Sequence, residues 1–490
     1  MLQKKALVIG AGIAGIATAI RLAVKGYQVN VFEANSYPGG KLSQFSNDGF
    51  RFDAGPSLLT MPQYIDELFK LAGKTPADYF NYRQLYVICH YFYEDGKSLK
   101  AYANADKFIT EAESVTGEPA AGIKKYINNS RRIYNITNHV FLERSLHRLK
   151  TYLRWDTLKS IINLPHIDAG RTMHNANADY FNDQHLIQLF DRYATYNGSN
   201  PYTAPATLNV IPHLEQHYGA YFPEEGMYSI VTALVKLAKD MGVTFHYNSR
   251  VQEVVLDEDK ADGVKVNGQL IKADVVVSNM DVWFTYHRLL KDYPHLHPKK
   301  ILGQERSSSA LIFYWGINKQ FAQLNLHNIF FSADYKAEFN HIWKQNNIYH
   351  DPTVYLNISS KYKPDDAPPG CENWFTMINV PANTGQDWNT LINTARQNIL
   401  TKLSRLLGED IAPLISCERI LDPRSIESQT SSYQGSLYGT SSNSRFAAFL
   451  RHANKSSKIK NLYFCGGSVH PGGGIPLCLL SAKIVSEWVD

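Results

Sequence analysis

The residues Ala6-Leu-Val-Ile-Gly10-Ala-Gly12-Ile-Ala-Gly15 decide the fold of this 490-residue chain. Residues 6–9 predict a short buried strand, and the apolar pattern that follows predicts a helix that opens among the three spaced glycines. Residues 29–32 predict a second strand, and Glu33 ends it, 18 positions beyond Gly15. Strand, glycine-rich turn, helix, strand and acid together are the fingerprint of a Rossmann-type dinucleotide site.

Each residue of this fingerprint has a physical task. Gly10 makes the tight turn, Gly12 lets the backbone approach a pyrophosphate, and Gly15 allows the helix to pack closely against the strand. The phosphates then lie at the positive amino end of the helix. The carboxylate of Glu33 is expected to accept hydrogen bonds from ribose hydroxyls and to repel a 2′-phosphate.

The last thirty residues supply a second glycine-rich turn. Residues 462–465 predict a strand that runs into Gly466-Gly467, and residues 472–474, all glycine, precede an apolar pattern to Trp488 that predicts a helix. Glycine lets the backbone approach a ligand, and the helix presents its positive end to it. Ordinary strand-to-helix packing is the alternative, but the pairing with the amino-terminal motif favours a shared ligand site.

A further glycine pair indicates the ligand. Gly39-Gly40-Lys41 and residues 52–57 follow Glu33, and FAD-binding chains of the glutathione-reductase type use such a pair to pass the ribityl and phosphate region. A site built from both ends of the chain suits a permanently held flavin, so we expect non-covalent FAD. The expected contacts are Gly10, Gly12, Ala14, Gly15, Glu33, Ala34, Gly39, Gly40, Lys41, Gly55, Pro56, Ser57, Val251, Gly466, Gly467, Gly474 and Ile475.

The order of these motifs predicts an α/β fold with a discontinuous Rossmann-like FAD-binding domain of glutathione-reductase or amine-oxidase type. This domain is expected to comprise residues 1–90, 220–285 and 425–490. Residues 95–215 predict a helical, membrane-associating substrate region, and residues 290–420 an inserted α+β substrate-binding domain. The 44% hydrophobic and 19% charged content is that of a globular protein.

Charge and composition narrow the partners. A net charge of +5 gives no indication of nucleic acid binding. No signal peptide and no run of 18 apolar residues is evident, which predicts a cytoplasmic protein. His213 and His217 lie one helical turn apart, but the spacing of Glu215 differs from the metalloprotease motif, so we expect a surface helix and no metal.

Residues 141–164 predict an amphipathic basic helix. Leucines recur at positions 142, 146, 149 and 153, accompanied by Arg144, Arg148, Lys150, Arg154 and Lys159 and by Trp155. This pattern is typical of an interfacial membrane helix. A helix packed on the core with a solvated basic face is the alternative. The first interpretation makes a lipid surface a partner, at the inner face of the cell membrane.

Together these motifs resemble the carotenoid (phytoene-type) desaturase family over nearly the whole chain, and His470-Pro-Gly-x-Gly-Ile-Pro476 is the most specific element. Residues 196–202 and 466–477 look closest to the 1-hydroxycarotenoid 3,4-desaturases. The family is similar in fold to FAD-dependent amine oxidases, and its members remove two hydrogens across a C–C bond of a polyene. One departure is Glu225-Gly226, where the family usually has Gly-Gly, and it suggests an added charge near the substrate entrance.

The resemblance implies 3,4-desaturation of a hydroxy-γ-carotene or hydroxylycopene, with oxygen or a quinone as the electron acceptor. Tyr196, Asn197, Asn200 and Tyr202 are then candidates for substrate binding, or they shape a turn. His470 is a candidate base, or it orients its loop. Phytoene desaturation, or another carotenoid desaturase or isomerase activity, is the alternative. An amine oxidase-like flavoenzyme and a non-enzymatic prenyl-binding escort protein are remoter ones.

Overall fold

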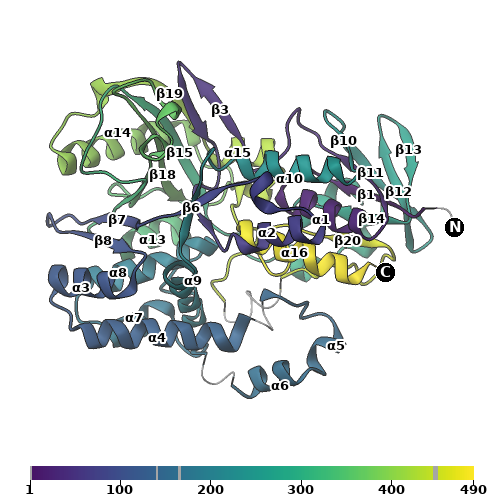
Figure 1. The fold of residues 1–490 in the computed structure, drawn as a ribbon, viewed down its shortest axis with the longest axis horizontal. Helices are drawn as coiled ribbons and strands as arrows, with labels where there is room; N and C mark the ends of the chain where they lie inside the picture. Colours follow the sequence, from purple (N-terminus) through teal and green to yellow (C-terminus); the bar gives the residue numbers. More distant parts are fainter. Residues whose placement is uncertain (1–2, 139–141, 164–166, 445–450, 490) are drawn as a thin grey trace.

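The computed structural model describes residues 3–138, 142–163, 167–444 and 451–489. Two sheets lie towards opposite ends of the long axis of the molecule, and helices α3, α4, α7 and α8 lie below one of them (Figure 1). Strands and helices from both chain ends meet in the other part, so the two termini lie on the same side. Among the described residues, no helix is long and apolar enough to cross a membrane.

A five-stranded parallel sheet carries the dinucleotide motif. Its strands lie in the order β10-β2-β1-β14-β20, and they are Thr244–His246, Gln28–Phe32, Lys5–Ile9, Val275–Ser278 and Leu462–Phe464. The helices α1 (Ile13–Val24), α10 (Ser229–Asp240) and α16 (Ile475–Trp488) share one apolar core with it. The antiparallel strands β11 (Val251–Asp257), β12 (Lys260–Val266) and β13 (Gln269–Lys272) form a second core with it. The predicted Rossmann-type arrangement is confirmed, with strands drawn from three distant segments.

A seven-stranded mixed sheet forms the other part. Its order is β19-β15-β18-β17-β16-β7-β8, with strands Ile415–Leu421, Ser309–Ile317, Glu372–Val380, Val354–Asn357, His327–Phe330, Val87–Phe92 and Ser98–Tyr102. Helix α14 (Trp388–Leu407) packs against it in a further core. Residues 87–102 therefore belong to this sheet, whereas the predicted boundary near residue 90 divides them. The pairing of β7 with β16 joins residues far apart in sequence, which local patterns do not indicate.

The helical region packs against strands of this second sheet. Its main elements are α3 (Ala105–Thr116), α4 (Ala120–Thr137), α7 (Met173–Tyr180), α8 (Gln184–Asp191), η4 (Arg192–Asn197) and α9 (Ile211–Tyr218). Side chains of α3, α4 and α8 share a core with β7, β8 and β16. The predicted surface helix, α9, is half-buried: Ile211, His213 and Glu215 are buried, whereas His217 is exposed. That prediction is wrong because α9 packs against α4.

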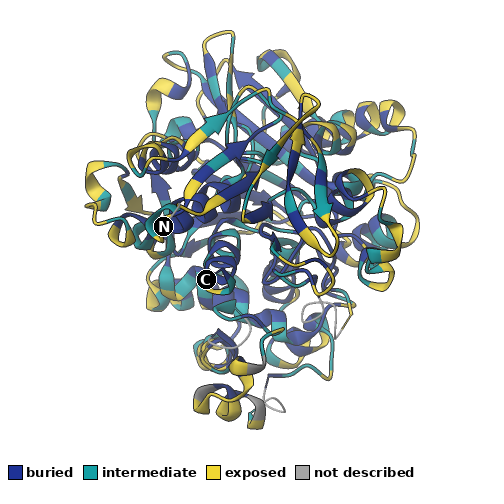
Figure 2. Ribbon diagram, turned by 90° about the vertical axis from the view of Figure 1, so that its right-hand side faces the viewer, coloured by how far each residue is buried: buried dark blue, intermediate teal, exposed yellow. Residues whose placement is uncertain are grey.

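The predicted basic helix is two short helices. These are α5 (Leu149–Tyr152) and α6 (Trp155–Ile162), with a break at Leu153 and Arg154. Residues 141 and 164, the ends of the predicted helix, lie outside the described residues. In Figure 2, α6 is the lowest helix and is largely exposed. The continuous helix is therefore not formed, although its apolar and basic residues are present at this surface.

Candidate functional site

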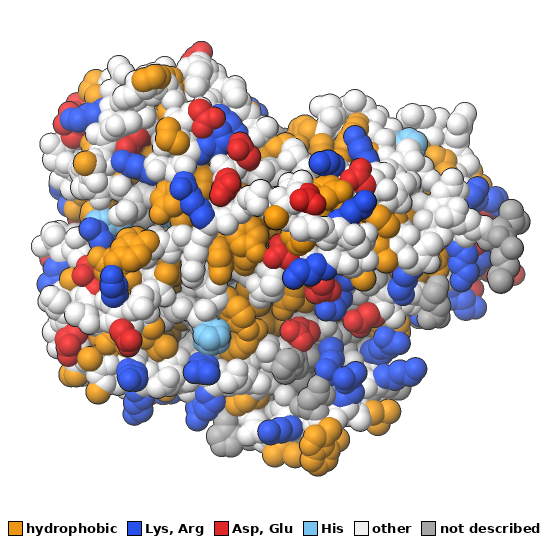
Figure 3. Space-filling model, in the orientation of Figure 1, with side chains coloured by type: hydrophobic (Ala, Val, Ile, Leu, Met, Phe, Trp, Pro, Cys, Tyr) orange, Lys and Arg blue, Asp and Glu red, His pale blue; other side chains and the backbone are white. Residues whose placement is uncertain are grey.

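One cavity of about 760 Å³ extends from the carboxyl edge of the parallel sheet to residues of the seven-stranded sheet and the helical region. This volume is in the usual range for a buried cofactor or ligand, about 300–1,000 Å³. Hydrophobic side chains gather in the hollowed middle of the face shown in Figure 3. Every predicted cofactor contact lines the cavity except Gly15.

Gly15 and its neighbours show how closely the turn is packed. A Cβ on Gly15 would lie 2.2 Å from the carbonyl oxygen of Gly10, so this glycine serves helix–strand packing rather than ligand contact. Gly10 has a φ of +93°, which favours glycine at the tight turn. A Cβ on Gly12 would lie 2.7 Å from Oδ1 of Asn279. The turn therefore has no room for a side chain at Gly12 or Gly15.

Asn279 ties the two glycine-rich turns together. It follows β14 directly, and its Oδ1 accepts a hydrogen bond from the Gly15 N–H at 3.1 Å. Its Nδ2 donates to the Cys465 carbonyl at 3.2 Å, beside Gly466. The sequence prediction did not include this residue. Its position just after a buried parallel strand was a signal, because ligands of open α/β sheets bind at the carboxyl ends of the strands.

Glu33 is buried at the end of β2, with 7% of its surface exposed. Its Oε2 accepts a hydrogen bond from the Ala11 N–H at 2.8 Å, and its Oε1 accepts one from the Asn35 N–H at 2.9 Å. Each carboxylate oxygen has a second lone pair. These acceptors lie on the cavity wall and fit the hydroxyl groups of a ribose.

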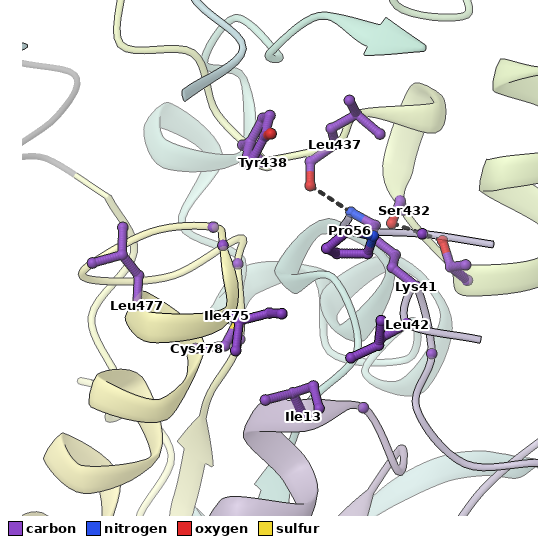
Figure 4. A pocket seen from close by; sticks show the side chains of 18 of the residues that line it. Ile13, Lys41, Leu42, Pro56, Ser432, Leu437, Tyr438, Ile475, Leu477 and Cys478 are labelled. Atoms are coloured by element: carbon purple, nitrogen blue, oxygen red, sulfur yellow. Dashed lines mark hydrogen bonds between the residues drawn. The ribbon is translucent and has the colours of Figure 1, made fainter. Parts of the chain in front are cut away.

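Two cationic side chains, those of Lys41 and Arg451, line the cavity. The Nζ of Lys41 donates to the carbonyl oxygens of Ser436 and Leu437 at 3.0 and 2.7 Å, and burial lowers its pKa to about 8. Figure 4 shows Lys41 beside Pro56 and across from Ile475 at the start of α16.

Arg451 is 1% exposed and binds the carbonyl oxygens of Tyr438 and Gly467, at 2.8 and 3.3 Å. Its Nη2 has no hydrogen-bond partner among the described residues. Among the described residues, the hydrogen-bond partners of Arg451 are backbone carbonyl oxygens and not carboxylates, and such a buried cationic donor fits an anionic group such as a diphosphate. Together with the glycine turns and Glu33, the donor set therefore fits a dinucleotide.

His470 lies outside the lining of the cavity, although Pro471 belongs to it. Its Nε2 is bound to the Arg144 carbonyl oxygen at 2.7 Å, and burial lowers the pKa of its imidazole to about 4. This arrangement matches the alternative in which His470 orients its loop.

The predicted substrate residues divide into two groups. Tyr196 and Asn197 line the cavity, whereas Asn200 and Tyr202 do not. The Oδ1 of Asn200 accepts from the Tyr202 N–H at 2.9 Å, which is the turn-shaping alternative. Glu225 is exposed and outside the cavity lining, so the charge that distinguishes this chain from the family pattern does not enter the site.

A buried polar cluster lines the substrate end, and sequence reasoning missed it. Glu215, 2% exposed, accepts hydrogen bonds from the hydroxyls of Tyr193 and Tyr196. The guanidinium of Arg192 lies 3.7 Å from Glu215 and donates to the Tyr91 hydroxyl at 2.7 Å. The position of Glu215 among buried residues of α9 is set by tertiary packing, so in the sequence it is visible only as a charged residue between two histidines.

Comparison with known proteins places this site in a family. Residues 13–489 match the family described as flavin containing amine oxidoreductase. The chain is 50% identical over 487 residues to the "1-hydroxycarotenoid 3,4-desaturase" of Flavobacterium sp. (strain P99-3), covering 99% of both chains. It is 33% identical to the "4,4'-diapolycopene oxygenase" of Methylomonas sp., covering 99% of this chain and 98% of that one.

Among solved structures, an oxidoreductase from Methanosarcina mazei aligns with a TM-score of 0.65 at 16% identity. The alignment covers 99% of this chain and all of the other, and at this identity it shows the fold alone. The chain belongs to the flavin containing amine oxidoreductase family. It is an FAD-dependent oxidoreductase, and the resemblance to carotenoid desaturases is confirmed.

Proposed function

We propose that this member of the flavin oxidoreductase family removes two hydrogens across the 3,4 carbon–carbon bond of a 1-hydroxycarotenoid. The observation that carries the proposal is the 50% identity to a 1-hydroxycarotenoid 3,4-desaturase over essentially the full length of both chains. The cavity supports it, because one continuous space joins the dinucleotide turns to a chamber lined by apolar and tyrosine side chains. A long apolar polyene needs such a chamber next to its cofactor.

Different residues along the cavity would contact different parts of the cofactor and the substrate. Glu33 and the turn at Gly10 and Gly12 would hold the adenosine and diphosphate part of FAD, and Lys41 would lie beside its flavin part. FAD, when bound, supplies the hydride acceptor. Ile312, Ile329 and Met377 belong to β15, β16 and β18 of the seven-stranded sheet and line the cavity, where they would exclude water from the substrate.

Removal of the proton needs no strong base in the protein. Loss of a hydride next to a conjugated polyene leaves a positive charge that is shared among many carbons, and the neighbouring protons are therefore acidic. This agrees with the position of His470, whose Nε2 is bound to a backbone carbonyl away from the cavity lining. Water or a weak acceptor completes the reaction, and oxygen or a quinone then takes the electrons.

The test is to supply phytoene, γ-carotene and 1-hydroxylated γ-carotene separately to the purified, FAD-loaded protein. We expect the hydroxylated compound to give a red-shifted product that has lost two hydrogens. A product that has gained oxygen would favour an oxygenase activity, as in the name of the Methylomonas relative. Conversion of phytoene with no reaction of the hydroxylated compound would replace the proposal by phytoene desaturation.

We further propose that α5 and α6 dock the protein on the inner surface of the cell membrane. Leu153, Trp155 and Ile162 are 81, 82 and 75% exposed, and Leu158 is 41% exposed. These four residues form the exposed apolar patch. Trp155, Leu158 and Ile162 share one helix face by their spacing. Lys and Arg side chains lie beside hydrophobic ones at this edge of the molecule (Figure 3), which is the composition of an interfacial anchor.

The basic residues of this segment have different surroundings. Arg148 lies 5.2 Å over the ring of Trp488 and donates to the Glu487 carbonyl, so it holds the segment to α16. Lys150 and Lys159 are exposed. They are therefore the better choice for testing contact with anionic lipid, because their replacement leaves the packing of the segment intact.

Liposome sedimentation separates the two contributions. Replacing Leu153, Trp155 and Ile162 by Gln should release the protein from anionic vesicles, since each buried large apolar side chain contributes about 1.5–3 kcal/mol. Replacing Lys150 and Lys159 by Gln should weaken binding by about 1 kcal/mol each at low salt and have little effect at high salt. Leu270→Gln, at an exposed apolar position on β13, is the matched control. Equal sedimentation of all variants would remove the membrane role of this segment.

A further inference from the structure

His327 is a buried histidine at the substrate end of the cavity. It begins β16, is 3% exposed and lines the cavity. Its Nδ1 lies 2.8 Å from the Tyr355 hydroxyl and 3.1 Å from Nδ2 of Asn357. Its Nε2 has no hydrogen-bond partner among the described residues. A buried polar atom without a partner on a cavity wall indicates a ligand atom that completes it.

The neighbouring hydrogen bonds assign the proton of this imidazole. The Nδ2 of Asn357 also donates to the carbonyl oxygen of Leu326 at 3.1 Å, which fixes the amide with its NH₂ group towards His327. An NH₂ group only donates, and the Tyr355 hydroxyl can accept from Ser57 while it donates to Nδ1; we therefore assign Nδ1 of His327 as the acceptor and place the ring proton on Nε2. Burial and the charge of Arg192 lower the pKa of His327 to about 3, which keeps the ring neutral. The free group is therefore an N–H donor.

Hydrogen bonds link His327, at the substrate end of the cavity, to a residue of the cofactor half. The Tyr355 hydroxyl that contacts His327 also lies 2.6 Å from the hydroxyl of Ser57. Ser57 follows Pro56, which Figure 4 shows beside Lys41. Two short hydrogen bonds therefore connect His327 to the segment that passes the flavin part of the site.

The position of the hydroxyl in the substrate makes this location significant. In a 1-hydroxycarotenoid the oxygen is on C1, and only one methylene separates C1 from C3, where the new double bond begins. A group that binds the hydroxyl must therefore lie beside the reacting bond. Groups at the far end of the chamber cannot meet this requirement.

Resting on the function proposed above, we infer that the His327 Nε2–H donates a hydrogen bond to the tertiary hydroxyl oxygen of the substrate and selects hydroxylated over unhydroxylated carotenoids. Without the hydroxyl, the donor stays buried and unpaired against a hydrocarbon, which penalises the wrong substrate. His327 is thus a specificity-determining residue of the site.

Other polar groups of the chamber are less suited to this role. Glu215 accepts hydrogen bonds from the hydroxyls of Tyr193 and Tyr196 and lies 3.7 Å from the cationic Arg192, so its charge has partners within the protein. In the described part of the chain the Nε of Arg192 has no hydrogen-bond partner, but its guanidinium carbon lies 4.4–5.2 Å from the ring centres of Tyr193, Tyr91 and Tyr196, so tyrosine rings surround this group. Thr207 also lines the cavity, and its Oγ1 has no hydrogen-bond partner among the residues that the structure describes, so it is the competing candidate.

Two amide variants of His327 form a matched pair for the test. In His327→Asn, the amide occupies the position of Nδ1 and can keep the contacts with Tyr355 and Asn357, but the donor at the Nε2 position is lost. In His327→Gln, the longer amide places an NH₂ near the Nε2 position. Thr207→Val removes the competing hydroxyl with almost no change of shape. FAD content and melting temperature of each variant show whether the fold is intact.

The measurement is kcat/KM for 1-hydroxylated γ-carotene and for γ-carotene, with kcat and KM separated. We expect His327→Asn to reduce the preference for the hydroxylated compound by about tenfold to a hundredfold, mainly through the hydroxylated substrate. His327→Gln should recover part of this preference, and Thr207→Val should retain it. An unchanged preference in a folded His327→Asn variant, or its loss in Thr207→Val alone, would overturn the inference. Failure of the wild-type protein to convert either carotenoid would instead refute the proposed function.

Discussion

Replacing Glu33 by Gln tests the assignment of the nucleotide half of the site. The carboxylate accepts one backbone N–H on each oxygen, from Ala11 at 2.8 Å and from Asn35 at 2.9 Å. A glutamine keeps one oxygen, and its NH₂ group then faces an N–H donor. The variant therefore loses one internal hydrogen bond and, when FAD is bound, one acceptor for a ribose hydroxyl.

These two losses are measured separately. Loss of the internal hydrogen bond lowers the stability of the apoprotein. The same bond is missing when FAD is bound, so its loss does not change the Kd for FAD. Loss of the ribose contact should weaken FAD binding by about 1–3 kcal/mol, which is roughly 5- to 150-fold in Kd. The assay is fluorescence titration of apoprotein with FAD, combined with thermal unfolding of the apoprotein. Glu225→Gln is the control, because Glu225 is exposed and outside the cavity lining.

The outcome distinguishes a binding role from a structural one. An apoprotein with a lower melting temperature but an FAD Kd within about twofold of the wild-type value would show that Glu33 only supports the turn. The assignment of the ribose contact would then be wrong, whatever the activity of the variant.

Two further predictions concern residues beneath the glycine turns. Asn279→Ala leaves the Gly15 N–H and the Cys465 carbonyl without their side-chain partner. We expect it to lower the free energy of unfolding, measured by urea titration, by about 2–4 kcal/mol. A change under about 0.5 kcal/mol would show that Asn279 does not connect the two glycine turns. Burial lowers the pKa of His470 from 6.5 to about 4. Between these two pH values, the unfolded chain binds a proton at His470 that the folded chain does not bind. Stability should fall between pH 6.5 and 4 by up to about 3 kcal/mol, and His470→Asn should flatten the decrease in melting temperature; parallel curves would contradict this.

The sequence predicts best those features whose partners are near in the chain. The strands β1 and β2 and helix α1 follow from the spacing of Gly10, Gly12 and Gly15, and the contacts among them lie within thirty residues. The C-terminal turn also follows from local glycines. The same physical reason explains why most of the predicted cofactor contacts line the cavity, because they belong to short motifs with a known geometric task.

Features set by distant partners were not predictable. The parallel pairing of β7 with β16 joins residues more than two hundred positions apart, so no local pattern assigns residues 87–102 to the second sheet. Burial of Glu215 and His327 depends on how α9 and the β-strands close around the cavity. For Tyr196 to Tyr202 the turn chemistry was visible in the sequence, but whether each side chain faces the cavity depends on tertiary packing.

The most direct test of the account is a single-turnover experiment without an electron acceptor. FAD-loaded protein is mixed anaerobically with 1-hydroxylated γ-carotene or with γ-carotene, and the flavin and polyene absorbances are followed together. We predict loss of the oxidised flavin absorbance with equimolar appearance of the longer, red-shifted polyene, and a much slower change with γ-carotene. Flavin absorbance that stays constant with the hydroxylated compound, or reacts equally fast with both carotenoids, would contradict the proposed 3,4-desaturation of a hydroxylated substrate.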